Sequence, residues 1–294
     1  MVNHLLQPMA HVLDRRHRQQ RWLALGGISI FTVVSVTFAA RALPVRVDRG
    51  LLVRQLQGEV TMLRTGSAAP AAQGARLSAV GDGLRTGRRS AAVLEVDTDV
   101  GFLDVSEQTE LRIRTLEMAP DGGRITHLNV PRGQVRTRLR RFTNQGSQFE
   151  IETPAGISGV RGTEFGVSVQ EDGKTGIATL TGAVDTIAVG ETVAVPAGFQ
   201  NLIWPGEPPT QPVPLRDDPG LEYDRQVIFE NNTRYVTLIG RVDPVNTVFV
   251  DGAPQTVDRQ GEFRITRLAT SRLRVEVVVI TPLGRQELHE IYLL

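Results

Sequence analysis

The chain has 294 residues, no cysteine, 40% hydrophobic residues, and 33 Lys and Arg against 32 Asp and Glu. The missing cysteines exclude disulfide scaffolds, thiolate metal sites and thiol nucleophiles, and the net charge of +1 excludes a strongly basic nucleic-acid binder. The charges are unevenly placed: four Arg and one Asp fall in the first 21 residues, and ten bases face 13 acids in residues 205–294. This gradient is the first indication of a membrane topology.

A segment without charge runs for 19 residues, from Trp22 to Ala40. As a helix it would be roughly 28 Å long, close to the ~30 Å hydrocarbon core of a bilayer. The residues before it include a group of arginines that the positive-inside rule keeps in the cytoplasm, namely Arg15, Arg16, Arg18 and Arg21. We therefore expect an uncleaved signal anchor, with the N-terminus in the cytoplasm and the rest of the chain outside. A cleaved signal peptide is the alternative, because Ala40 and Ala42 have the spacing of a cleavage site.

After Pro44 the chain consists of short runs that alternate apolar and polar residues, such as 58–63, 92–96 and 110–114, separated by Gly and Asp-Gly turns. This pattern predicts antiparallel strands and no helix. Residues 205–214 contain five prolines, which favour an extended linker. Five further short strands follow, and they suit a small sandwich. The predicted organisation is a cytoplasmic tail over 1–21, a membrane helix over 22–43, an all-β domain over 44–204, a Pro-rich linker over 205–229 and a small β-sandwich over 230–294.

The most distinctive passage reads Gly159, Val160, Arg161, Gly162, Thr163, Glu164, Phe165. We expect Phe149 and Ile151 before it, and Phe165 within it, to point into a core. Its two glycines allow a positive φ or a close backbone approach, as at a tight corner. Arg161 is expected to snorkel or to pair with a carboxylate such as Glu164.

This passage resembles the signature of the FecR-domain family, in which a Thr-Pro strand leads into V-R-G-T-x-F. Residues 80–87 are similar to the family's GD-x-L-x-T-G opening, 130–135 to its L-x-x-G-x-V strand and 181–184 to its closing strand. The resemblance spans about 56–204 and implies an extracytoplasmic β-sandwich on a single-pass protein of the bacterial inner membrane, with its C-terminal domains in the periplasm. Residues 248–263 are similar to bacterial Ig-like modules of the glucodextranase type.

The family resemblance leaves three functions open. The first is a membrane-anchored interaction, sensing or scaffold component of the cell envelope, with an envelope protein or cell-wall polymer as partner. The second is a transmembrane signalling regulator of the FecR anti-sigma type; the 21-residue tail is short for a sigma-binding domain, which disfavours a sigma-factor partner. The third is a peptidoglycan- or carbohydrate-binding accessory, suggested by the Ig-like module alone.

No pattern of catalytic or metal-binding residues is found in the sequence, so we expect neither an enzyme nor a cofactor. One basic cluster is a candidate for binding an anionic partner: Arg132, Arg136, Arg138, Arg140 and Arg141. Three of these share strand parity and would line one face. The alternative is an ordinary solvated face whose charges are balanced by nearby acids. A nucleic-acid partner is not expected in the periplasm.

Overall fold

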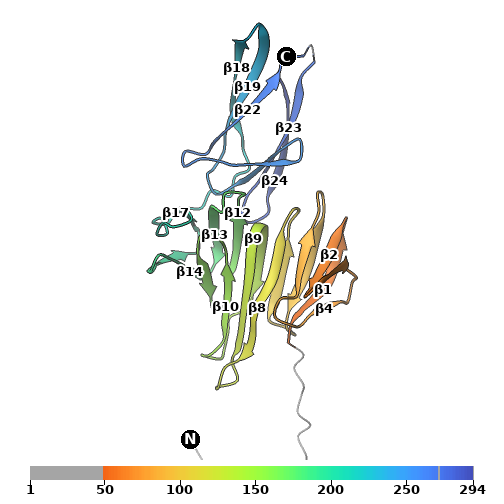
Figure 1. Cartoon of the computed structure of the whole chain (residues 1–294). Helices are drawn as coiled ribbons and strands as arrows, with labels where there is room; N and C mark the ends of the chain where they lie inside the picture. Colours follow the sequence, from red (N-terminus) through yellow and green to blue (C-terminus); the bar gives the residue numbers. More distant parts are fainter. Residues whose placement is uncertain (1–48, 271, 294) are drawn as a thin grey trace, which may run out of the picture. The chain divides into compact units, whose positions relative to one another are not determined.

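The computed structural model describes residues 49–270 and 272–293, and every regular element in this part is a β-strand (Figure 1). The predicted tail and membrane helix lie outside the described residues. Within them, no helix is long and apolar enough to cross a bilayer.

The first domain consists of two nine-stranded sheets that share one long strand, β9 (Arg124–Leu139). Sheet A has the order β4 (Arg76–Leu77), β1 (Leu51–Gln57), β6 (Ala91–Val96), β7 (Gly101–Val105), β9, β12 (Glu164–Val169), β13 (Thr175–Thr181), β16 (Phe199–Ile203), β17 (Val213–Pro214). Sheet B has the order β3 (Ser67–Pro70), β2 (Val60–Arg64), β5 (Gly83–Thr86), β8 (Glu110–Met118), β9, β10 (Gln148–Glu152), β11 (Ile157–Val160), β14 (Ala183–Ala188), β15 (Glu191–Pro196).

Strand β9 passes from one sheet to the other near its middle. Residues up to Arg132 pair with β8 and β10, and residues from Gly133 onward pair with β7 and β12. The change falls beside Pro131, which has no N–H to donate to a ladder. The two sheets enclose one apolar core, in which Leu128, Phe149 and Phe165 are fully buried.

One pairing differs from the antiparallel arrangement expected from the sequence. Strands β9 and β10 are parallel, with Phe149 opposite Thr126. A parallel pair needs a long crossover, and here the second half of β9, which crosses to sheet A, together with residues 140–147 provides it. Hydrophobic alternation reports which face is buried but not which way a neighbouring strand runs.

The C-terminal part is a second two-sheet structure with its own apolar core. One sheet has the order β18 (Glu222–Glu230), β19 (Thr233–Arg241), β22 (Glu262–Leu268); the other has the order β21 (Ala253–Gln255), β20 (Thr247–Val250), β23 (Arg274–Ile280), β24 (Gln286–Tyr292). All five strands expected from the sequence are present. We call this part the C-terminal module; its Ig-like classification stays a prediction.

The segment predicted as a linker, 205–229, contains two strands. Strand β17 pairs with β16, the Thr210 N–H donates to the Leu202 carbonyl, and β18 begins at Glu222. The prolines do keep residues 205–212 out of the sheet, but backbone hydrogen bonds hold the segment against the first domain. The sequence pattern missed β18 because none of its nine residues is buried.

The C-terminal module packs on the outer face of sheet A. Gln134, Ser168 and Gln170 lie on that face, yet each is at most 4% exposed, because each donates a side-chain hydrogen bond to a carbonyl of the module. The acceptors are the carbonyls of Thr281, Val245 and Asn246. Strand alternation predicts that these polar side chains face solvent. In the structure they instead form the contact surface between the first domain and the C-terminal module.

Candidate binding surfaces around the signature corner

The signature passage forms the corner at which the chain leaves sheet B for sheet A. Strand β11 ends at Val160 and β12 begins at Glu164, so Arg161, Gly162 and Thr163 make the crossing. Val160 and Phe165 are buried on either side, and the Thr163 side chain donates to the Ala183 carbonyl. The predicted inward positions of Phe149, Ile151 and Phe165 are confirmed.

The two signature glycines have different roles. Gly162 has a φ of 107°, and a Cβ there would lie 2.2 Å from the Cα of Arg141, so both its conformation and its surroundings require glycine. Gly159 lies in β11, and the atom nearest to a Cβ there would be 3.8 Å away. The expectation of a positive φ or a close approach therefore holds at Gly162 and not at Gly159.

Arg161 and Glu164 do not form the expected pair. The Arg161 guanidinium donates to the Gln145 carbonyl at 3.1 Å and is exposed. Glu164 instead pairs with Arg136, its diagonal neighbour in the β9–β12 ladder, in which Arg138 lies directly opposite Glu164. Residues three apart on either side of a sharp corner point in different directions, whereas antiparallel neighbours share a face.

Three of the five clustered arginines are balanced by acids. Arg136 pairs with Glu164, Arg138 with Asp104 at 2.9 Å, and Arg132 lies 3.9 Å from Glu110. Partial burial opposes the charge on Glu110, but hydrogen bonds from Arg85 and Arg112 outweigh it and hold the pKa of this carboxyl below its ordinary value. This is the solvated, charge-balanced arrangement that the sequence analysis left as the alternative.

Arg140 and Arg141 are different, because they follow the end of β9 at Leu139. Within the part of the chain that the structure describes, neither guanidinium has a carboxylate at ion-pair distance, and both residues are exposed. Together with Arg124 they line a cavity of about 130 Å³. The cluster of five is thus divided by the structure into a paired group on β9 and an unpaired group beside this cavity.

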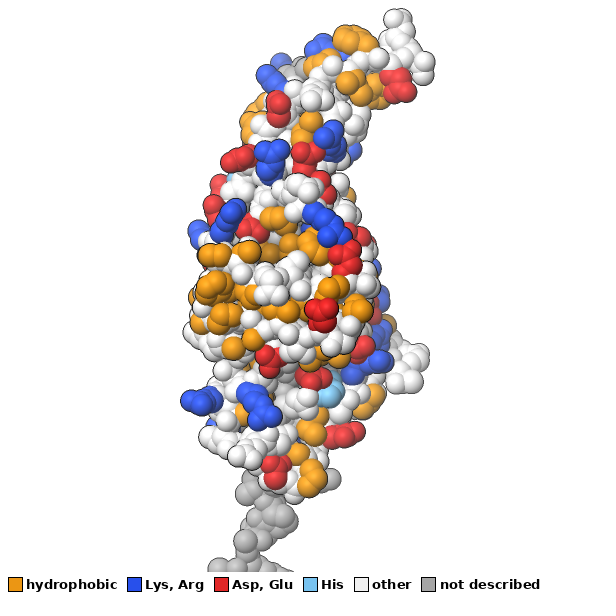
Figure 2. All heavy atoms as spheres, turned by 90° about the vertical axis from the view of Figure 1, so that its left-hand side faces the viewer, with side chains coloured by type: hydrophobic (Ala, Val, Ile, Leu, Met, Phe, Trp, Pro, Cys, Tyr) orange, Lys and Arg blue, Asp and Glu red, His pale blue; other side chains and the backbone are white. Residues whose placement is uncertain are grey.

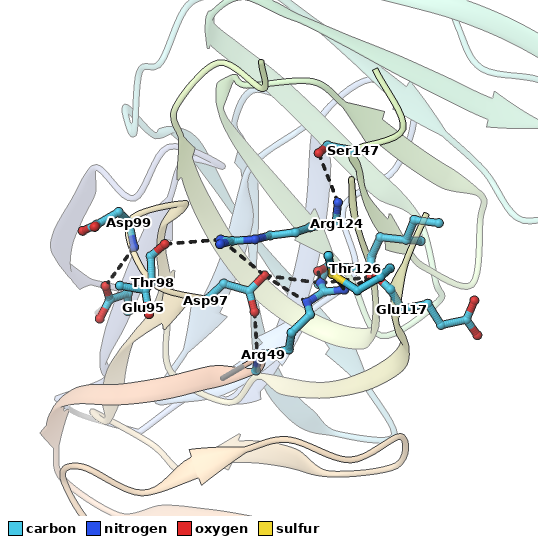
Figure 3. A network of polar contacts seen from close by, with 12 residues as sticks. Arg49, Glu95, Asp97, Thr98, Asp99, Glu117, Arg124, Thr126 and Ser147 are labelled. Carbon is cyan, nitrogen blue, oxygen red and sulfur yellow. Dashed lines mark hydrogen bonds and ion pairs between the residues drawn. The ribbon is translucent and has the colours of Figure 1, made fainter. Parts of the chain in front are cut away.

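A polar network joins the start of the described chain to the same region (Figure 3). The Asp97 carboxylate accepts from the Gly50 N–H at 2.8 Å and from Arg49, while Arg49 also donates to Thr126 and to the carbonyls of Glu117 and Ile125. Burial lowers the pKa of Arg49, and the adjacent Asp97 works against that shift. The backbone N–H of Arg124 donates to the Ser147 hydroxyl. Its guanidinium donates to the Thr98 carbonyl and lies 4.0 Å from the Asp97 carboxylate.

No pattern in the sequence predicts a polar network of Arg49, Asp97 and Arg124. Asp97 has a φ of 48°, as in a turn. Its partners lie 48 and 27 residues away in the chain, and no local pattern reports such a distance. The network could be recognised only after β1, β6 and β9 were placed together.

Lys174 was also overlooked, although the sequence carries a signal for it: it is the single lysine among 33 basic residues. It is 1% exposed at the contact with the C-terminal module, where its Nζ donates to the Val257 carbonyl. Burial lowers its pKa to about 8, and three carboxylates, those of Asp172, Asp258 and Asp243, work against that shift. An ammonium of this kind can lose its proton when buried, which a guanidinium cannot.

An apolar area covers β13 to β17, on the side where the two sheets end in the edge strands β15 and β17. Figure 2 shows hydrophobic side chains gathered there with few charges among them. The large exposed hydrophobic residues of this area, which we call the apolar face, are Leu180, Val189, Phe199 and Val213. Strands β15 and β17 are the outermost strands of their sheets on this side.

The arginines that predict the membrane orientation, Arg15, Arg16, Arg18 and Arg21, lie outside the described residues.

Comparison with known proteins gives one family match. Residues 82–185 match the family model described as FecR protein. No curated protein matches the chain. Among solved structures, two crystal structures of a candidate anti-sigma factor from Parabacteroides distasonis ATCC 8503 are 18% identical, with TM-scores of 0.37 and 0.36. Each match covers 47% of this chain and 65% of that one, which is just under two thirds of its length.

A polysaccharide lyase is 8% identical, with a TM-score of 0.19, and its match covers 84% of this chain and 40% of that one. At TM-scores this low, none of these structural likenesses supports an inference about function. The family match does not depend on them. It includes the signature corner, both halves of β9 and the cavity arginines. Residues 82–185 of this chain are therefore a FecR domain.

Proposed function

We propose that this protein is a non-enzymatic signalling regulator of the FecR type. It is anchored in the bacterial inner membrane by residues 22–43 and carries its two sandwiches in the periplasm. The observation that carries the proposal is the match of residues 82–185 to the FecR family. The basic residues before the uncharged segment support the orientation.

The apolar face is where we expect a protein partner to bind. Its large hydrophobic residues, Leu180, Val189, Phe199 and Val213, are between 36% and 67% exposed. An exposed apolar area with few charges among its side chains is typical of a surface that another protein covers. An envelope protein that binds there would change the state of the regulator without any chemical step.

Transcription is the readout that separates a signalling role from a scaffolding role. We expect that deleting the protein, or replacing Phe199 and Val213 by Ser, changes the expression of one set of promoters that depend on a single sigma factor. The full-length protein should co-purify with that sigma factor from detergent-solubilised membranes. The matched control replaces Val80, which is 63% exposed but lies in the loop before β5.

A scaffold role, the second candidate, is favoured by the same apolar face. It predicts that the double replacement alters envelope integrity while every sigma-dependent promoter set stays unchanged. A carbohydrate-binding accessory would instead sediment with purified peptidoglycan. A transcriptome identical to that of the parent strain would reject the signalling proposal.

A further inference from the structure

The cavity beside the signature corner has the composition of an anion site. Its buried lining includes Val96, Val100 and Phe149, and its more exposed lining includes Arg124, Arg140 and Arg141. A volume of about 130 Å³ accommodates a group the size of a phosphate. An apolar base strengthens charge interactions at the opening, because it keeps the local dielectric low.

The positive charges of Arg140 and Arg141 at this cavity are not neutralised by the described residues. Asp97 is the one acidic residue in its lining, and that carboxylate already binds Arg49 and the Gly50 N–H and lies 4.0 Å from Arg124, so the unbalanced charge is that of Arg140 and Arg141. The neighbouring arginines of β9 give the contrast, since Arg132, Arg136 and Arg138 each face an acid within 4.0 Å. Unpaired guanidinium groups next to a cavity are free to bind an external anion.

The signature corner holds the two consecutive arginines in place. The Phe142 N–H donates to the Arg161 carbonyl at 3.2 Å, and the Arg140 N–H donates to the Val100 carbonyl at 3.0 Å. Gly162 lies directly against the Arg141 backbone. The backbone that carries the guanidinium groups is therefore fixed before any ligand arrives, which reduces the ordering cost of binding.

We propose that the cavity lined by Arg124, Arg140 and Arg141 binds a phosphate-bearing anion. A carboxylate offers two oxygens in one plane, whereas a phosphate group offers oxygens in several directions to guanidinium groups that come from different strands and loops. The cavity is close to Arg49, whose side chain contacts the lining residue Thr126. The predicted membrane segment ends six residues before Arg49, so at most roughly 22 Å of chain separates the two.

Two sources would present this chemistry: the headgroup of an anionic phospholipid and a soluble phosphate ester. Calorimetric titration of the full-length protein in neutral detergent distinguishes them. The probes are dihexanoyl-phosphatidylglycerol, glycerol 3-phosphate and, as a zwitterionic control, dihexanoyl-phosphatidylcholine. Binding of phosphatidylglycerol alone identifies a lipid headgroup, and binding of both anions identifies the phosphate group itself as sufficient.

The variants are chosen to remove equal charge from the two groups of arginines. Replacing Arg140 and Arg141 by Ser should weaken anion binding at least tenfold, whereas replacing Arg132 and Arg138 by Ser should change it less than threefold. If the first variant does not fold, Arg140→Lys with Arg141→Lys keeps the charge and should still weaken binding severalfold by removing the guanidinium forks. Equal weakening in both variants, or no binding of either anion by the unmodified protein, would overturn the proposal.

Discussion

At the scale of single residues, the signature glycines permit a direct comparison. We expect Gly162→Ala to lower the free energy of unfolding by about 3 kcal/mol, because the new Cβ would both oppose a φ of 107° and collide with the Arg141 backbone. Gly159→Ala is the control and should change it by less than about 0.5 kcal/mol, since the atom nearest to its Cβ would be 3.8 Å away. Urea unfolding followed by circular dichroism measures both. Similar losses in the two variants would mean that the corner does not require its glycine.

Lys174 gives a residue-scale prediction about pH. The folded-state pKa is about 8 against an ordinary value of 10.5, so between these values the unfolded chain binds a proton that the folded chain does not. Stability therefore rises with pH across this window and carries a constant penalty below pH 8. Relative to Lys174→Met, the natural protein should gain about 2 kcal/mol between pH 7 and pH 9.5. An unchanged difference between the two pH values would mean that burial does not lower the pKa of Lys174.

At the scale of elements, β18 stands apart from the other strands of the C-terminal module. It pairs with β19 along all nine residues, and its other edge faces no strand among residues 49–270 and 272–293. Long exposed edges of this kind readily accept a further strand. We expect the β18 amides that point away from β19 to exchange with solvent as fast as amides in loops, while β19, which lies between β18 and β22, stays protected.

Hydrogen exchange of the full-length protein in detergent tests this prediction. Slow exchange on the outward side of β18 would show that another strand, from a partner or from a second copy, covers the edge in solution. Tyr223, Val227 and Phe229 share one side of β18, and all three are more than 40% exposed. Replacement of Phe229 by Ser should therefore lower the free energy of unfolding by less than about 1 kcal/mol if the edge is free.

At the scale of the whole molecule, the contact between the FecR domain and the C-terminal module decides whether the two parts unfold together or separately. A Cβ at Gly166 would lie 1.9 Å from the Pro282 carbonyl oxygen, so Gly166→Ala should separate the module from sheet A while the core beneath β12 stays intact. We expect the natural protein to unfold in one calorimetric transition. The variant should show two, with the first at least about 5 °C lower.

Gly159→Ala is again the control, because it adds the same methyl group to β11, where the atoms nearest to the new Cβ belong to Glu150 and Asp185 of the first domain. It should keep the single transition. One transition that merely shifts in Gly166→Ala would mean that the two sandwiches unfold together for a reason other than this contact. Two transitions in the natural protein would contradict the prediction directly.

The sequence alone determined the all-β class, the FecR resemblance, the inward positions of Phe149, Ile151 and Phe165, and the five main strands of the C-terminal module. These follow from local patterns, because alternation and turn residues act over a few positions. Only the tertiary structure decided that Arg136 and Arg138 are balanced by acids while Arg140 and Arg141 line a cavity. It also decided that polar residues of sheet A are buried under the module. Partners in ion pairs and in domain contacts lie tens of residues apart in the chain, and folding alone brings them together.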